Sequence, residues 1–329
     1  MPAALVVVVV RLPFNFLFHS SLMPILRRKA YLNFTGLFSL VFLLFFASCE
    51  KDVNINLESV PPQIVVQGVI ENGQPPYVIL NTTFGFFSQV DLSTVANSFV
   101  HGAVVKVSDG IKTITLKEYS IDTSGGNRFY VYFIDTTNLG NVLVGELGKT
   151  YTLTIDKDGQ RYSSITKIPY PKGPDTVWFG EPVFKRPTTP ATALEMFANY
   201  TDPDTPGNYV KYFTKRNNEQ FNPGGIFTDE LVNGQPVKNI DLFAGTPDDN
   251  SGSSNSDSVY YFFPGDSVTL KWCEVDKGIY DFWNTYEFAI RSGGNPFSSP
   301  INVKTNMTNG ALGSWAGYGA LYYDRVAHP

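Results

Sequence analysis

The feature of the sequence that most clearly predicts chemistry is the thiol of Cys49. This cysteine closes the tripeptide Ala47-Ser48-Cys49, which follows an apolar run at 37–46 and a basic cluster at 27–29. Basic residues, a short apolar run and small residues, in that order, are typical of a bacterial signal peptide. A cysteine at its end indicates a lipoprotein, whose thiol receives a diacylglyceryl group before the leader is cleaved. We therefore predict that Cys49 is the lipidated N-terminus of the mature chain.

The apolar run 37–46 is shorter than the roughly 20 residues that a membrane-spanning helix needs. An ordinary N-terminal membrane helix with a chance cysteine is the alternative, and it fits the short run and the small residues less well. Residues 1–22 do not fit the signal peptide, so we expect Met23 to be the true start. Residues 1–48 then form the leader and signal peptide. Residues 49–62, which are polar and lack apolar periodicity, form a lipidated tether.

A second group of residues could bind a metal ion. Asp202, Asp204 and Asn208 supply carboxylate and amide oxygens within one short segment, and Ca²⁺ prefers such ligands. The segment lacks the further glycine and the distal glutamate of the EF-hand loop. Acidic loops are also common as solvated turns, because Asp and Asn side chains bond to nearby backbone groups. Sequence alone leaves both interpretations open.

Two aromatic residues near the C-terminus could bind a partner. Trp315 and Tyr318 lie in the segment 310–319, which contains four glycines. Glycine offers no side chain to pack around these rings. We therefore consider an aromatic platform for a glycan, a peptide or a receptor, since such rings give a large contact area at low entropic cost. The alternative is that Trp315 belongs to a core, because large aromatic side chains are mostly buried.

A possible modification site is Ser258. The tripeptide Asp257-Ser258-Val259 is similar to the O-glycosylation acceptor of secreted proteins of Bacteroidota, which is Asp, then Ser or Thr, then an apolar residue or Thr. It adjoins the polar segment 248–258, which we expect to be a surface loop. A three-residue motif also arises by chance.

The sequence contains no recognisable catalytic motif. Gly313-Ser314-Trp315-Ala316-Gly317 does not have the spacing of the nucleophile elbow, Gly-x-Ser-x-Gly. Once Cys49 is lipidated, Cys273 has no partner for a disulfide, and one thiol with two distant histidines leaves a zinc or haem site without ligands. We expect no cofactor and no enzymatic activity. A pair of carboxylates distant in sequence could still form a glycosidase site, so a hydrolase stays as an alternative.

The charge balance argues against nucleic acid as a partner. The whole chain has 25 basic and 30 acidic residues, a net charge of −5. Removing residues 1–48 takes away four basic residues and no acidic ones, which leaves 281 residues with a net charge of −9. Binding to nucleic acid requires lysine and arginine to neutralise the phosphates.

The remaining pattern predicts a mainly β protein with two domains. Residues 63–168 contain about seven short, alternating segments separated by turn signals, which indicates an immunoglobulin-like β-sandwich. The proline-rich segment 169–175 predicts a stiff linker. Residues 176–329 form a second β-rich domain with one amphipathic helix at 277–291. Asp276 is the expected N-cap of this helix, whose apolar face is formed by Ile279, Phe282, Trp283, Tyr286 and Ile290.

These features together resemble the lipoproteins of Bacteroidota known as domain of unknown function 4249. The resemblance rests on the order of the lipidation motif, Ile64-Val65-Val66-Gln67-Gly68, Gly148-Lys149-Thr150-Tyr151-Thr152-Leu153, Asp202-Pro203 with Gly207-Asn208-Tyr209, and Asn295-Pro296-Phe297 ahead of Asn306 and Gly310 to Gly313. It covers roughly the whole mature chain. Tyr209 stands alone where the family often has two tyrosines.

The resemblance implies a binding or accessory role in nutrient uptake through a TonB-dependent receptor. It also implies an outer-membrane protein that is anchored through the lipid on Cys49 and faces the cell exterior. The alternatives are a surface enzyme that hydrolyses glycans or peptides, and a purely structural surface scaffold. The ligand is not predicted by the sequence.

Overall fold

The computed structural model describes residues 61–84, 91–123, 126–138, 140, 142–185, 187–243, 261–292, 299 and 301–329. The predicted leader, the lipidation site Cys49 and the glycosylation site Ser258 lie outside these residues. The described residues all belong to one compact unit that extends from residue 59 to residue 329.

The main element is a sheet of eleven strands in the order β11-β10-β13-β14-β1-β2-β5-β4-β3-β6-β7. Its strands are β1 (Ile64–Glu71), β2 (Tyr77–Thr82), β3 (Val104–Ser108), β4 (Thr113–Asp122), β5 (Arg128–Phe133), β6 (Thr150–Lys157), β7 (Gln160–Lys167), β10 (Tyr209–Arg216), β11 (Asn222–Thr228), β13 (Ser267–Glu274) and β14 (Leu312–Val326). A second, three-stranded sheet has the order β12 (Pro236–Leu242), β9 (Glu195–Thr201) and β8 (Thr176–Gly180). The helices are α2 (Leu92–Asn97) and α3 (Lys277–Ser292). The prediction of a mainly β fold is confirmed.

The long strand β14 joins the two halves of the chain in one sheet. It pairs in parallel with β1, the first strand, and antiparallel with β13. The linker predicted at 169–175 therefore does not separate a sandwich at 63–168 from an independent domain at 176–329. Local sequence patterns do not contain this long-range pairing, which is why they suggested a boundary.

The strands of the N-terminal half are linked by hydrogen bonds in the order β1-β2-β5-β4-β3-β6-β7. Strand β4 is shared between two sets of strands, because its residues 113–116 pair with β3 and its residues 117–122 pair with β5. Their core includes residues from the C-terminal end of the chain, among them Met307, Ala311 and Trp315. The alternation of apolar residues predicted the strands correctly, but it does not specify which strands are neighbours.

Two glycines of β14 explain how the chain crosses this strand. A Cβ atom at Gly317 would lie 2.5 Å from the carbonyl oxygen of Lys167, and one at Gly319 would lie 2.1 Å from that of Pro169. The backbone that leaves β7 therefore passes directly over β14, where only glycine allows such an approach. The same crossing is fixed beyond Pro169 by the indole N–H of Trp272, which donates to the carbonyl of Lys172 at 2.9 Å.

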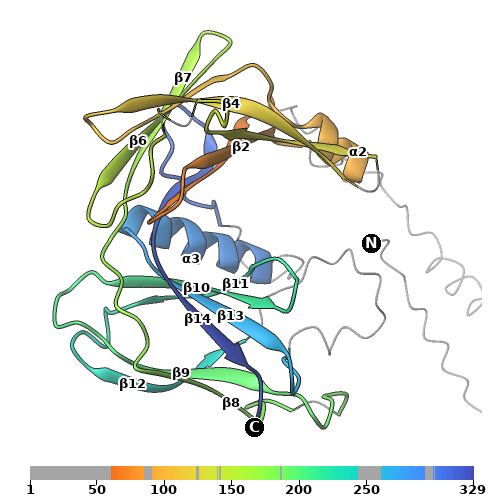
Figure 1. Cartoon of the computed structure of the whole chain (residues 1–329), viewed down its shortest axis with the longest axis vertical. Coiled ribbons are helices and arrows are strands. Elements are labelled where there is room, and N and C mark those ends of the chain that lie inside the picture. The colour runs from red at the N-terminus through yellow and green to blue at the C-terminus, as the bar shows by residue number, and fades with distance from the viewer. Residues whose placement is uncertain are drawn as a thin grey trace, which may run out of the picture. The chain divides into compact units, whose positions relative to one another are not determined.

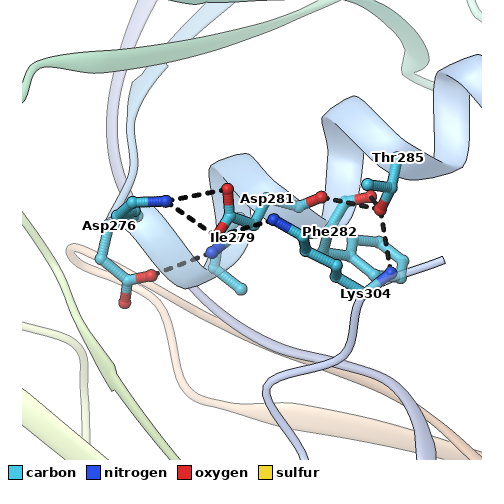
Figure 2. A network of polar contacts seen from close by, with 7 residues as sticks. Asp276, Ile279, Asp281, Phe282, Thr285 and Lys304 are labelled. Carbon is cyan, nitrogen blue, oxygen red and sulfur yellow. Dashed lines mark hydrogen bonds and ion pairs between the residues drawn. The ribbon is translucent and has the colours of Figure 1, made fainter.

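The predicted helix 277–291 is confirmed as α3, and Asp276 caps it as expected. Its Oδ1 accepts the backbone N–H of Ile279 at 3.0 Å, as Figure 2 shows. Its Oδ2 accepts the hydroxyl of Thr166 and the backbone N–H of Lys167, so the same carboxylate ties the helix to β7. Further along, the hydroxyl of Thr285 accepts the N–H of Lys304 at 2.9 Å (Figure 2). Side-chain hydrogen bonds thus connect α3 to its neighbours at its N-terminus, through Asp276, and near its middle, through Thr285.

Strands β10 and β13 are covered on both faces (Figure 1). One face packs on α3, through a cluster that includes Cys273, Ile279 and Tyr318. The other face packs on the second sheet, through a cluster that includes Tyr212 and Trp272. Because side chains alternate along a strand, the even-numbered residues of β10 and β13 face the second sheet. Among the described residues, no helix has the length and hydrophobicity to span a membrane.

Candidate functional site

The two aromatic residues expected to form a platform are both buried. Trp315 has no exposed surface, and its indole N–H donates to the carbonyl of Tyr151 at 3.0 Å. Tyr318 is 4% exposed and accepts a hydrogen bond from the indole of Trp283. The two side chains belong to different core clusters. The expectation of an exposed platform is therefore wrong, because the glycine-rich segment is a strand inside the sheet and not a surface loop.

The predicted calcium ligands do not converge on a metal site. The Oδ2 of Asp202 accepts the N–H of Gly234 at 3.2 Å, and the Oδ1 of Asp204 accepts the side-chain amide of Asn233 at 3.3 Å. Within the described part of the chain, no group of three or more histidine, cysteine, aspartate or glutamate residues is arranged to hold a metal ion. Asp202 and Asn208 instead line a cleft, whereas Asp204 is exposed outside it.

This cleft lies between the second sheet and the strands β10, β11 and β13, and its volume is about 470 Å³. Its lining consists of Tyr200, Asp202, Asn208, Val210, Phe227, Thr228, Asp229, Glu230, Leu231, Val232, Val237, Lys238, Asn239, Ile240 and Trp272. Most of the wall is apolar, with a few polar groups at fixed positions. Sites for small molecules have this size and this composition. We call it the aromatic–acidic cleft.

Three aromatic rings form one wall of the aromatic–acidic cleft. The centroid of the Trp272 ring lies 5.4 Å from that of Tyr200 and 6.4 Å from that of Phe227. Each ring comes from a different strand, namely β9, β11 and β13. The wall is therefore rigid, because it is built on paired strands and not on a loop.

Two buried carboxyl groups line the same cleft. Asp202 is 5% exposed and Asp229 is 4% exposed. The Oδ2 of Asp229 accepts the backbone N–H groups of Gly207 and Asn208, at 2.7 and 3.0 Å. Asp229 was not predicted as a site residue. An aspartate directly after a strand is usually solvated, so its position in the sequence does not indicate burial.

A third carboxyl group, that of Glu274, lies near Asp202 and Asp229 but does not line the cleft. Glu274 is opposite Val210 in the pairing of β10 with β13, and it shares the face of Trp272 two residues away. It is 3% exposed; its Oε1 accepts the N–H of Tyr209 at 3.2 Å, and its Oε2 has no partner among the described residues. The alternation of Val268, Leu270 and Trp272 could have predicted that Glu274 points inward.

The three carboxyl groups influence one another. Burial raises the pKa of Glu274 to about 8, and the charges of Asp202 and Asp229 act in the same direction. Burial also raises the pKa of Asp202, to which the charge of Asp229 adds. The Tyr200 hydroxyl, which has no hydrogen-bond partner in the described residues, has its pKa raised by burial and by all three carboxyl groups. Glu274 therefore holds its proton at neutral pH.

Lys172 influences Asp202, but its ion pair is with another carboxylate. The Nζ of Lys172 lies 4.7 Å above the Tyr200 ring and forms an ion pair with Asp175 at 3.1 Å. The charge of Lys172 lowers the pKa of Asp202, but it is the weakest of the influences on that pKa. In the described residues, no ion pair includes Asp202, Asp229 or Glu274.

The thiol of Cys273 does not act as a nucleophile at the cleft. Cys273 is fully buried on the opposite face of β13, and burial raises the pKa of its thiol to about 12. A thiol in that state does not react as a thiolate. The cleft offers rings, carboxylates and backbone amides, which are groups that bind a ligand.

One family model matches most of the chain. The family described as "Domain of unknown function (DUF4249)" matches residues 50–321, which include every residue of the cleft. This description contains no enzymatic activity. No curated protein matches the sequence.

Proposed function

We propose that this chain, which belongs to the DUF4249 family, is a lipid-anchored binding protein of the bacterial outer membrane. In this proposal the aromatic–acidic cleft captures a small molecule outside the cell, and a TonB-dependent receptor then imports it. The observation that carries the proposal is the cleft itself. It is a space of about 470 Å³ with three rings on one wall and two buried carboxylates on its surface.

The segment that precedes the folded region supports a membrane anchor. A basic cluster, an apolar run and Ala47-Ser48-Cys49 follow one another in the order of a lipoprotein signal peptide. The family match begins at residue 50, directly after Cys49, which agrees with a mature domain that starts at this position. Acyl chains such as palmitate on Cys49 would hold the protein at a membrane, because two chains anchor firmly where one does not.

The role in uptake is supported by the resemblance to surface lipoproteins of Bacteroidota that accompany TonB-dependent receptors. It agrees with the construction of the cleft, since an accessory protein must hold its ligand without changing it. A hydrolase would need a proton donor in contact with the substrate. Glu274, the one carboxyl group here whose pKa lies near 8, is not among the residues that line the cleft.

The test uses the native lipoprotein, tagged at its C-terminus and purified from outer membranes in mild detergent. Native mass spectrometry should detect a retained small molecule or, after its removal, binding from a metabolite panel. The variant Val237→Trp should abolish binding, because the indole would fill the cleft that Val237 lines. Ile165→Trp is the matched control, since Ile165 is an exposed strand residue that does not line the cleft.

A receptor that copurifies with the wild-type protein would support the role in uptake. The proposal fails if no small molecule binds the wild-type protein, or if Val237→Trp binds as well as Ile165→Trp. Conversion of a bound glycan or peptide by the purified protein would favour the hydrolase instead.

A further inference from the structure

The two faces of β10 and β13 differ in how their buried charged side chains are paired. On the face toward α3, the buried lysine Lys211 forms an ion pair with Glu287 at 2.8 Å. On the same face Lys271 forms an ion pair with Glu71, whose carboxylate also accepts the hydroxyl of Tyr322. Each buried cation on this face therefore has its own carboxylate.

The face toward the second sheet has the opposite arrangement. Asp202, Asp229 and Glu274 are each at least 95% buried, and within the described residues their hydrogen-bond donors are backbone N–H groups alone. Such N–H groups satisfy part of the hydrogen-bonding capacity of a carboxylate, but they do not neutralise its charge. Asp202 and Asp229 line the cleft, and burying ionised carboxylates without a counter-ion is unfavourable, so a cation supplied from outside would be stabilised beside these two groups.

A buried polar atom gives a second, independent indication of a missing partner. The hydroxyl of Tyr200 has no hydrogen-bond partner among the described residues, and the Tyr200 side chain is more than nine-tenths buried. Tyr200 lines the cleft, and its hydroxyl lies close enough to Asp202, Asp229 and Glu274 for their charges to raise its pKa. Buried polar groups are nearly always paired, so an unpaired hydroxyl at a cleft indicates a ligand that carries a polar group.

The aromatic wall indicates what kind of ligand group fits the cleft. The rings of Tyr200, Phe227 and Trp272 make this wall aromatic and apolar, and ammonium groups on apolar frames pack favourably against aromatic rings. A metal ion does not suit this wall, because Ca²⁺ requires six to eight oxygen ligands. An anion would be repelled by the two carboxylates, and the one lysine of the lining, Lys238, is exposed at the rim.

We infer that the ligand of the aromatic–acidic cleft is an organic cation, an amine or a quaternary ammonium group carried on an apolar frame. This inference rests on the proposed function and adds the chemical class of the ligand. The ammonium group lies against the rings of Tyr200 and Trp272 and is neutralised by Asp202 and Asp229. The apolar frame contacts Val210, Phe227 and Ile240.

The test compares two pairs of molecules that differ in charge but not in shape. Choline is compared with its neutral carbon analogue 3,3-dimethylbutan-1-ol, and phenethylamine with 2-phenylethanol. Binding to the native lipoprotein is measured by saturation-transfer NMR and titration calorimetry at fixed ionic strength. We expect at least one cation to bind about tenfold or more tightly than its neutral counterpart, as a desolvated charge pair requires.

Two variants test whether the preference for a cation over its neutral analogue arises at the cleft. Asp202→Asn keeps an oxygen for the N–H of Gly234 but removes the charge, so the cation should lose about tenfold in affinity while the neutral analogue is unaffected. Asp204→Asn is the matched control: it makes the same change in net charge two residues away, at an exposed position outside the cleft. Circular dichroism checks that both variants are folded.

Equal affinities within both pairs, or an Asp202→Asn variant that binds the cation as the wild type does, would overturn the inference. The proposed function would survive that result if Val237→Trp still abolished binding of the retained small molecule. If neither pair binds at all, the inference is also wrong, and only the absence of any retained molecule would remove the proposed function with it.

Discussion

Gly68 on β1 and Trp315 on β14 lie opposite each other in the one parallel pair of strands among the described elements. A Cβ atom at Gly68 would lie 2.7 Å from the Cε3 of Trp315, so the indole covers this glycine directly. Through this contact the last strand of the chain closes the core of the N-terminal strands. The indole is therefore a structural element of the fold.

The first prediction concerns this indole. Trp315→Ala should lower the free energy of unfolding by about 3–5 kcal/mol, because a fully buried ring and its hydrogen bond to Tyr151 are lost. Urea denaturation of the two proteins measures the difference. Gly68→Ala should destabilise the wild type but much less the Trp315→Ala variant, since the clash then disappears. A variant Trp315→Ala with unchanged stability would contradict the core position.

The second prediction concerns the N-cap of α3. Asp276→Ala removes the acceptor of the Ile279 N–H and of two groups on β7, so it should destabilise the protein by about 1–3 kcal/mol. Asp281→Asn serves as a comparison, because its ion pairs with Lys277 and Lys304 are partly exposed and should contribute less than about 1 kcal/mol. Equal effects of the two substitutions in thermal unfolding would show that Asp276 does not connect the helix to the sheet.

The third prediction concerns the membrane anchor. If the Cys49 thiol accepts the diacylglyceryl group, as proposed, Cys49→Ala should leave the leader uncleaved and the protein without lipid. Intact-mass analysis and membrane fractionation measure both effects, with Cys273→Ala as the control that keeps the anchor. A Cys49→Ala protein of the mature mass that still carried lipid would refute the assignment. Added protease on intact cells tests the orientation, and full protection would indicate the periplasmic side.

Local patterns in the sequence predicted the elements but not their partners. The alternation in Tyr151 to Ile155 identified β6, and the helical spacing from Ile279 to Ile290 identified α3. Strand β14 was missed because its glycines resemble a loop. Those glycines are required where the backbone after β7 crosses the strand, and such a contact between distant segments has no local signature.

The candidate site was predicted only in part for the same reason. Asp202 and Asn208 were identified as binding residues, but for calcium, since their neighbours in sequence suggested a chelating loop. Asp229 and Glu274 approach Asp202 only because β10, β11 and β13 fold against the second sheet. The chemistry of the cleft thus depends on residues between 200 and 274 that no single segment contains.

The last prediction uses the raised pKa of Glu274. Burial holds this pKa at about 8, well above the value of 4.5 for an exposed glutamate. Between these two pH values the folded protein retains a proton that the unfolded chain releases. The free energy of unfolding therefore decreases as the pH rises from about 4.5 to about 8. The groups that face Glu274 act in both directions: the charges of Asp202 and Asp229 strengthen the effect, and the N–H of Tyr209 weakens it.

Glu274→Gln removes the titrating group and so should remove this loss of stability. The variant should match the wild type near pH 4.5 and exceed it progressively up to pH 8, by an amount on the order of a few kcal/mol, since one pKa unit corresponds to about 1.4 kcal/mol. Urea denaturation at several pH values measures the difference, and Glu146→Gln, at an exposed position, should show none of this trend. A difference that stays constant from pH 4.5 to pH 8 would mean that Glu274 is already ionised in the folded protein.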